Sequence, residues 1–303
     1  MINETLWITR EARRLGSLTR EGLVTPELVS RLFDNRRFRR LDIDREEVEV
    51  LFDSDAPVTY SRFVSGIFDL YGGRRGKPLV GDKSPGYVRE MGSLHALWPK
   101  ARFVHLIRDG RNVWLSVVGW KKADRSVGRF ATWTRDPVAT TALWWERSIR
   151  LGRETGTSLG QTLYHEVRYE DLVEDPAVVC RALCTFLGIH YDASMLRFNK
   201  GRTRREPGLG SKPAWLPPTP GLRDWRTQMP AEDVERFEAV SGDLLDELGY
   251  PRSVPEPSVE ARELAAEVRA AFIDALVSRG RRLPESWQPG QPRIRSSRSP
   301  RMM

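Results

Sequence analysis

Arg108 and Ser116 stand eight residues apart in a segment whose pattern suits phosphate binding. The apolar run at 103–107 predicts a strand that ends at Arg108, residues 109–110 predict a turn, and the apolar period that follows predicts a helix carrying Ser116. Open α/β sheets bind ligands where strand ends meet helix N-termini. An arginine fork, helix N–H groups and a hydroxyl all donate to phosphate oxygens. The segment therefore predicts a phosphate clamp, with an ordinary exposed arginine after a strand as the alternative.

Three other segments accompany this one in a fixed order. Residues 81–85 are Gly-Asp-Lys-Ser-Pro, 169–176 are Tyr-Glu-Asp-Leu-Val-Glu-Asp-Pro, and 221–226 are Gly-Leu-Arg-Asp-Trp-Arg. Together with residues 108–116 they resemble motifs of sulfotransferases that use 3′-phosphoadenosine-5′-phosphosulfate, and they cover most of residues 1–250. One such motif is a weak signal, whereas four in the family's order are a strong one.

This resemblance implies a fold and a reaction. The fold would be α/β, a P-loop-type parallel sheet flanked by helices, which also agrees with the alternation of strand and helix patterns. The reaction would be transfer of a sulfonate from 3′-phosphoadenosine-5′-phosphosulfate to a hydroxyl or amine acceptor. By the resemblance, Arg108 and Ser116 bind the donor's 3′-phosphate, Tyr169 forms a wall of the adenine site, and Arg226 belongs to a loop that folds over the nucleotide.

Two more residues are candidates for the chemical step. Lys83 follows a short apolar run within a set of turn-forming residues, so a plain turn is the alternative to a functional cation. Its match to the family implies contact with the transferring sulfonate, where a fixed ammonium would stabilise developing charge. Glu4 is by itself only a terminal glutamate. The resemblance makes it the general base, because an attacking hydroxyl must lose its proton.

The resemblance also implies a first strand and a Pro-Arg/Lys-Ser-Gly-Thr-Thr-like loop around the 5′-phosphosulfate, which this sequence lacks. The glycines at 72–76 precede a predicted strand instead of following one. We expect the native protein to start upstream of Met1. The alternative is an inactive truncated remnant that serves only as a nucleotide-binding or scaffold protein. A P-loop phosphoryl-transfer enzyme is a second alternative, but the sequence shows neither a Gly-Lys-Ser/Thr loop nor a matching Mg²⁺-binding aspartate.

Composition narrows the partners and the location. The 303 residues carry a formal charge of +8, but residues 279–303 hold seven Arg and one Glu, so the rest of the chain is nearly neutral and no nucleic acid is expected. The four His lack metal-ligand spacing, and the reaction needs no metal.

No apolar run approaches a transmembrane length, no signal peptide is evident and only two Cys occur, which predicts a cytoplasmic protein. The acceptor would be a small molecule, glycan or lipid, and the oligomeric state is open.

The elements that must position these residues follow from periodicity and punctuation. Asp175 is the expected N-cap of a helix that starts at Pro176 and stops at Gly188. Residues 123–138 and 200–222 are expected loops. The expected domains are a sulfotransferase-like domain at 1–255, a C-terminal helix at 256–283 and a basic disordered tail at 284–303. Strands are expected at 77–82, 101–107 and 161–168, and helices within 10–75 and at 86–98, 111–120, 139–154, 231–248 and 257–279.

Overall fold

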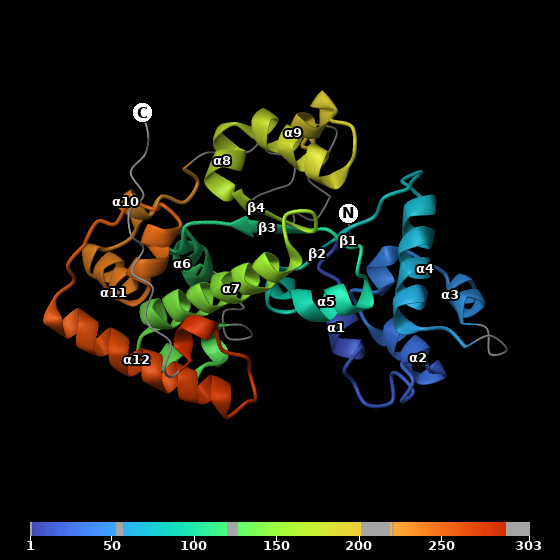
Figure 1. Cartoon of the computed structure of the whole chain (residues 1–303), viewed down its shortest axis with the longest axis horizontal. Coiled ribbons are helices and arrows are strands. Elements are labelled where there is room, and N and C mark those ends of the chain that lie inside the picture. Colours follow the sequence, from blue (N-terminus) through green and yellow to red (C-terminus); the bar gives the residue numbers. More distant parts are fainter. Residues whose placement is uncertain (1, 53–56, 120–126, 201–218, 220, 289–303) are drawn as a thin grey trace. The chain divides into compact units, whose positions relative to one another are not determined.

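The computed structural model describes residues 2–52, 57–119, 127–200, 219 and 221–288, with Asn3 described by its backbone alone. The chain divides into two compact units, Met1–Ala101 and Arg102–Met303 (Figure 1). Both combine parallel strands with helices, so the α/β prediction is confirmed. Among the described residues, no helix is long and apolar enough to cross a membrane.

The first unit consists mainly of helices. Its strands β1 (Ile2–Asn3) and β2 (Asp82–Lys83) run parallel. The side chain of Thr25 accepts a hydrogen bond from the N–H of Leu28, and in this way it caps a helix whose first residue is a proline. The helices are α1 (Ile8–Glu11), α2 (Pro26–Asp34), α3 (Arg45–Leu51), α4 (Tyr60–Gly73) and α5 (Met91–Leu97), with 3-10 turns at Arg39–Leu41 and Pro85–Arg89.

The strand predicted at 77–82 is wrong in extent, because β2 covers only Asp82 and Lys83. A strand needs a partner, and the two-residue β1 supplies one only here, where Ile2 N–H donates to the Gly81 carbonyl over 2.7 Å. The helix predicted at 86–98 is likewise divided. Its first part is a 3-10 turn, and the non-helical backbone of Glu90 (φ −121°, ψ 7°) separates that turn from α5.

The core of the first unit forms around Trp7. Its indole is fully buried and meets the ring of Phe38 edge-on, with centroids 5.6 Å apart. The buried hydroxyl of Tyr60, at the start of α4, donates to the carbonyl of Ile8 over 2.7 Å. These contacts connect the N-terminal segment to the helices that follow it. The other fully buried apolar side chains of this unit include Leu28, Leu32, Val48, Phe63, Val64 and Ile67.

The second unit holds the longer pair of strands. Strands β3 (Phe103–Ile107) and β4 (Tyr164–Arg168) pair in parallel over five residues each. Alternate side chains of β4 point to opposite faces: His165 stacks on Phe186 of α9, and Tyr164 packs where α7 carries Gly156. The helices are α6 (Gly110–Val118), α7 (Pro137–Leu159), α8 (Tyr169–Glu174), α9 (Pro176–Leu187), α10 (Trp225–Gln228), α11 (Ala231–Glu247) and α12 (Val259–Val277).

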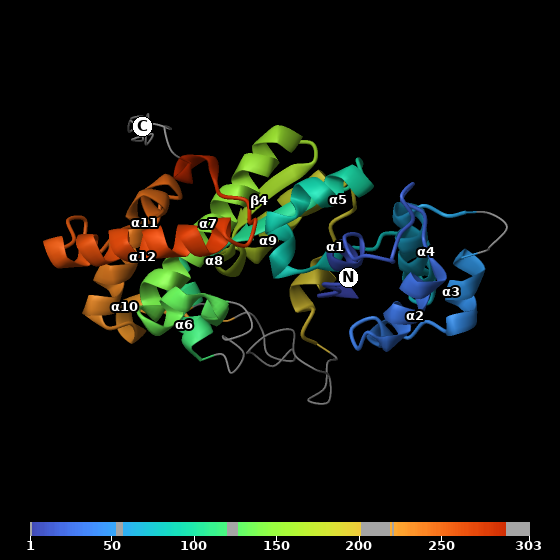
Figure 2. The ribbon, with the colours of Figure 1, turned by 90° about the horizontal axis from the view of Figure 1, so that it is seen from below.

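Helices α7, α11 and α12 lie side by side and share one apolar core (Figure 2). Phe272 of α12 is fully buried in it, so the predicted C-terminal helix is an integral part of the second unit. Trp287, in a short 3-10 helix at Glu285–Trp287, meets Phe272 edge-on. The prediction of a disordered tail from 284 onward is therefore wrong for 284–288, and residues 289–303 lie outside the described residues.

Local punctuation predicted α9 correctly. The side chain of Asp175 accepts from the N–H of Val178, Pro176 is the first helical residue, and Gly188 ends the helix at φ +63°. The predicted loop at 123–138 lies partly outside the described residues, and its described part contains 3-10 turns at Val127–Arg129 and Ala131–Thr134. Nearly all of the predicted loop at 200–222 lies outside the described residues.

Candidate functional site

The turn between β3 and α6 is fixed from several sides. The side chain of Asp109 caps α6 by accepting from the Arg111 N–H over 2.9 Å. Gly110 has no room for a side chain, since a Cβ there would lie 2.6 Å from ring atoms of both Trp145 and Phe237. The indole N–H of Trp145 donates to the carbonyl of Arg108 over 3.1 Å. The turn therefore holds the backbone of Arg108 against the core.

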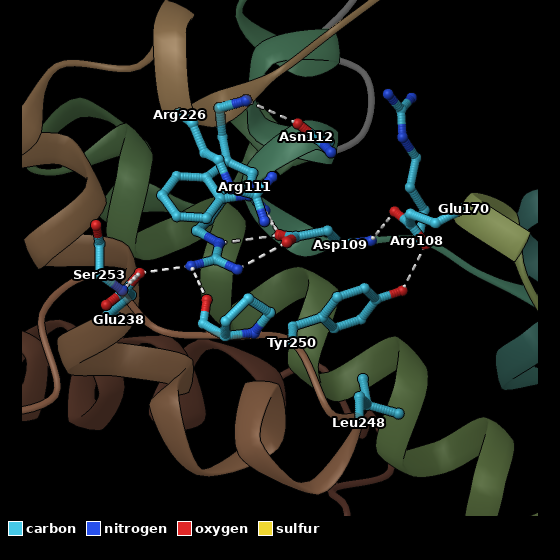
Figure 3. A network of polar contacts seen from close by, with 12 residues as sticks. Arg108, Asp109, Arg111, Asn112, Glu170, Arg226, Glu238, Leu248, Tyr250 and Ser253 are labelled. Atoms are coloured by element: carbon cyan, nitrogen blue, oxygen red, sulfur yellow. Dashed lines mark hydrogen bonds and ion pairs between the residues drawn. The ribbon is translucent and has the colours of Figure 1, made fainter. Parts of the chain in front are cut away.

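The Arg108 side chain leaves this turn in a direction away from the buried residues behind it (Figure 3). Its guanidinium lies 4.6 Å from the ring centroid of Tyr169, the first residue of α8. Among the described residues, its buried Nε has no hydrogen-bond partner. Burial, together with the like charge of Arg223, lowers the pKa of Arg108. A half-buried arginine beside a second arginine is a favourable place for an anion.

The other predicted donor-binding residues lie in the same unit. Ser116 is half-buried on α6, two turns after the helix start. Tyr169 contacts Arg108, as described above, and that contact joins the ends of β3 and β4. Glu170 holds the two turns together, because its carboxylate accepts from the Asp109 N–H over 3.0 Å and from the Tyr250 hydroxyl over 2.8 Å.

Arg226 has contacts of a different kind. Its side chain is 56% exposed, it pairs with Asp224 over 3.5 Å, and it lies over the ring of Trp225. It also lines a cavity of about 430 Å³ together with Trp225 and Met229. Among the described residues, Arg223 of the same segment is the one whose charge acts on Arg108. The charge of Arg223 thus connects the segment 221–226 with the predicted clamp, and the role of Arg226 stays a prediction.

A buried ion network supports the turn from behind (Figure 3). Arg111 is fully enclosed and bonds to the carboxylates of Asp109 and Glu238. Its guanidinium lies 3.6 Å from the ring centroid of Trp225. Removing one partner of such a network costs about 3–5 kcal/mol, because the remaining charges stay buried. In the sequence, the only sign of this network is an arginine in the first turn of an apolar helix.

The first unit brings together the two residues predicted for the chemical step. Glu4 directly follows β1 and Lys83 ends β2, and Glu4 Oε1 lies 2.8 Å from Lys83 Nζ. Arg37 approaches the other oxygen, Oε2, at 3.2 Å and also donates to the Glu4 carbonyl over 2.8 Å. Sequence reasoning missed Arg37, which no motif marks and which only the folded chain places beside Glu4.

These neighbours control the charge of Glu4. Burial by itself raises the pKa of the carboxyl, but the hydrogen bonds and charges of Lys83 and Arg37 outweigh it, and the pKa of Glu4 is lowered. The carboxylate is therefore ionised at neutral pH and can accept a proton. Both side chains keep partial exposure, 28% for Glu4 and 40% for Lys83, so the pair is accessible to a substrate. Among the described residues, no group of His, Cys, Asp and Glu is arranged to hold a metal ion.

The amino-acid sequence was compared with those of known protein families. Residues 16–193, more than half of the chain, match the sulfotransferase family. This range includes Lys83, Arg108, Ser116 and Tyr169, and it excludes Glu4 and Arg226.

Individual relatives cover parts of the chain. The omega-hydroxy-beta-dihydromenaquinone-9 sulfotransferase Stf3 of Mycobacterium bovis is 28% identical over 214 residues, 66% of this chain and 47% of that protein. Carbohydrate sulfotransferase 7 of Rattus norvegicus is 31% identical over 119 residues, 38% of this chain and 24% of that protein. The chain thus spans half or less of the length of these relatives. The sulfotransferase domain from the curacin biosynthetic pathway superposes with a TM-score of 0.46 and 18% identity, over 88% of this chain and 86% of that one. On the match of residues 16–193, the chain belongs to the sulfotransferase family.

Proposed function

We propose that this sulfotransferase uses 3′-phosphoadenosine-5′-phosphosulfate as its donor. The observation that carries the proposal is Arg108. It is half-buried, its Nε has no partner among the described residues, its guanidinium lies 4.6 Å from the ring centroid of Tyr169, and the charge of Arg223 acts on it. A bound phosphate would stabilise a half-buried guanidinium of this kind, because two charge-assisted hydrogen bonds would replace the hydration that burial removes. Ser116 would add a hydroxyl to the same phosphate.

Sulfonate transfer also needs a base and a cation at the reacting centre, and the first unit supplies this pair. In the proposed step, the acceptor oxygen attacks sulfur while the bond between sulfur and the 5′-phosphate oxygen breaks. The acceptor proton passes to Glu4, and Lys83 stabilises the charge that develops on the transferring and departing oxygens. The products are the sulfated acceptor and adenosine 3′,5′-bisphosphate. Since Glu4 Oε1 and Lys83 Nζ lie 2.8 Å apart, both groups act at one place.

The acceptor is proposed by class. The relatives are named for a hydroxylated dihydromenaquinone and for carbohydrate. We therefore propose a hydroxyl acceptor on a lipid or a glycan. The cytoplasmic location stays a prediction, supported only by two cysteines that are both free thiols.

The test is transfer of ³⁵S-labelled sulfonate to a hydroxylated isoprenoid quinone or to an oligosaccharide. The wild-type chain should label at least one of them. Glu4→Gln and Lys83→Ala should each lower the rate by on the order of 100-fold, whereas Glu49→Gln and Lys100→Ala, on exposed positions of the same unit, should not. A folded wild-type chain that binds adenosine 3′,5′-bisphosphate but labels no acceptor would favour the non-catalytic remnant.

A further inference from the structure

The backbone on both sides of Thr5 is unusual. Glu4 has φ +51° and Leu6 has φ +52°, a region that residues other than glycine seldom adopt. Such conformations persist only where surrounding contacts impose them, and they gather at functional sites. Thr5 itself is 1% exposed, and its side chain makes hydrogen bonds that hold this segment in place.

Those contacts form a short chain of hydrogen bonds. The Thr5 hydroxyl donates to Asp82 Oδ2 over 2.6 Å, and the Thr5 N–H approaches Asp82 Oδ1 at 3.4 Å. The Tyr87 hydroxyl lies 2.6 Å from the Thr5 oxygen. Because the one proton of the threonine hydroxyl goes to Asp82, Tyr87 must donate to Thr5. Asp82 thus holds Thr5 by side chain and backbone, and Tyr87 secures the hydroxyl from the other side.

The residues of this hydrogen-bonded series are sequence neighbours of Glu4 and Lys83, the two residues proposed for the chemical step. Thr5 directly follows Glu4, and Asp82 directly precedes Lys83. The parallel register sets Asn3 opposite Lys83, so an extended continuation of β1 would place Glu4 opposite Ser84. The left-handed turn at Glu4 instead leaves its carboxylate 2.8 Å from the ammonium of Lys83.

We propose that Thr5, held by Asp82 and Tyr87, is a positioning residue that turns the Glu4 carboxylate toward Lys83. The effect of Thr5 on catalysis rests on the proposed function, whereas the effect of Thr5 on the geometry of Glu4 does not depend on it. Thr5 touches neither the carboxylate nor the ammonium in any described contact. It acts through the backbone that it shares with Glu4.

The test compares variants that differ in one hydroxyl. Thr5→Val removes the hydroxyl and keeps the shape, and Thr5→Ser keeps the hydroxyl. The first readout is the pKa of Glu4, followed by ¹³C NMR on glutamate-labelled protein, with Glu4→Gln identifying the resonance. Thr5→Val should raise this pKa toward the ordinary 4.5, because the carboxylate leaves its two cations. Thr5→Ser should keep the wild-type value, and so should Thr19→Val, which alters an exposed turn of the same unit.

The second readout is kinetic. Thr5→Val should lower kcat on the order of 10- to 100-fold with little change in KM for the donor, and Thr5→Ser should restore kcat. Tyr87→Phe removes the hydroxyl that lies against Thr5 and keeps the Thr5 hydroxyl itself. It should shift both readouts in the same direction by less, so it replaces Thr5→Val if that variant fails to fold. An unchanged Glu4 pKa in the folded variant overturns the proposal. A raised pKa in a protein whose wild type transfers no sulfonate supports the positioning role and contradicts the proposed function instead.

Discussion

Two arginines three residues apart have opposite surroundings. Arg111 is fully enclosed by Asp109 and Glu238, so its charge is used within the fold. Arg108 directs its guanidinium away from that network and keeps an unpartnered Nε among the described residues. Sequence motifs marked Arg108 by its position after a strand. They did not mark Arg111 or Arg37, since Glu238 lies 127 residues from Arg111 and Glu4 lies 33 residues from Arg37.

At this scale we predict a difference between the two arginines of the segment 221–226. Arg223→Ala should weaken binding of adenosine 3′,5′-bisphosphate by roughly ten-fold, because the charge of Arg223 acts at Arg108. Arg226→Ala should have a smaller effect, since Arg226 is exposed and paired with Asp224. Isothermal titration calorimetry of both variants measures this. A larger loss in Arg226→Ala would contradict this expectation and would support Arg226, the residue predicted from sequence.

At the scale of elements, the sequence predicts the ends of a helix correctly where the residues that set those ends belong to the helix itself. The cap at Asp175, the proline after it and the glycine at 188 define α9 without outside help. The strand predicted at 77–82 failed because β2 exists only where β1 pairs with it. The turn between β3 and α6 was predicted, but its closeness to Trp145 and Phe237 became visible only in the fold.

The pair β3–β4 carries a buried histidine. His105 Nδ1 lies 2.7 Å from the Tyr164 hydroxyl, which donates to Glu166 over 2.8 Å, so the Nδ1–H of His105 donates to Tyr164. Burial, and to a lesser degree the charge of Arg153, lowers the pKa of His105 to about 4, although Glu166 acts in the opposite direction. The imidazole is therefore neutral in the folded protein at neutral pH.

This histidine predicts a pH dependence of stability. In the unfolded chain His105 titrates near 6.5, so between pH 6.5 and about 4 the unfolded state binds a proton that the folded state does not. The free energy of unfolding should fall as pH is lowered through this window. Urea unfolding at several pH values should show a shallower fall for His105→Gln than for wild type, with exposed His190→Gln as the control. Equal slopes for His105→Gln and wild type would contradict the account.

At the scale of the whole molecule, the chain forms two compact units, divided after Ala101. The sequence-based division placed its boundaries late in the chain, guided by the proline-rich break before 257 and the basic composition after 283. The basic composition after residue 283 shows the charge of this segment but not which of its residues pack on the core. The core of the second unit and the residues packed against it extend from Ile107 to Trp287. That is why the predicted start of the disordered tail was too early.

Trp287 therefore should contribute to stability. Its ring packs on Phe272, Arg269 lies over it at 5.0 Å, and its N–H donates to buried Glu146 over 3.3 Å. Trp287→Ala should lower the free energy of unfolding of the second unit by about 2 kcal/mol. Trp287→Phe keeps a ring and should cost less. Urea unfolding followed by circular dichroism gives both values, and a Trp287→Ala variant as stable as wild type would show that residues 284–288 are not part of the core.

The most direct test of the account is binding of adenosine 3′,5′-bisphosphate to the whole chain, by calorimetry, for wild type, Arg108→Ala and Arg236→Ala. Arg236 lies on α11 with its side chain 40% exposed, and it serves as a control for loss of one positive charge. We predict that wild type and Arg236→Ala bind alike, and that Arg108→Ala loses about 1.5–3 kcal/mol, roughly ten- to a hundred-fold in affinity. Equal binding by Arg108→Ala, or no binding by a folded wild-type chain, would contradict the phosphate clamp on which the proposed function rests.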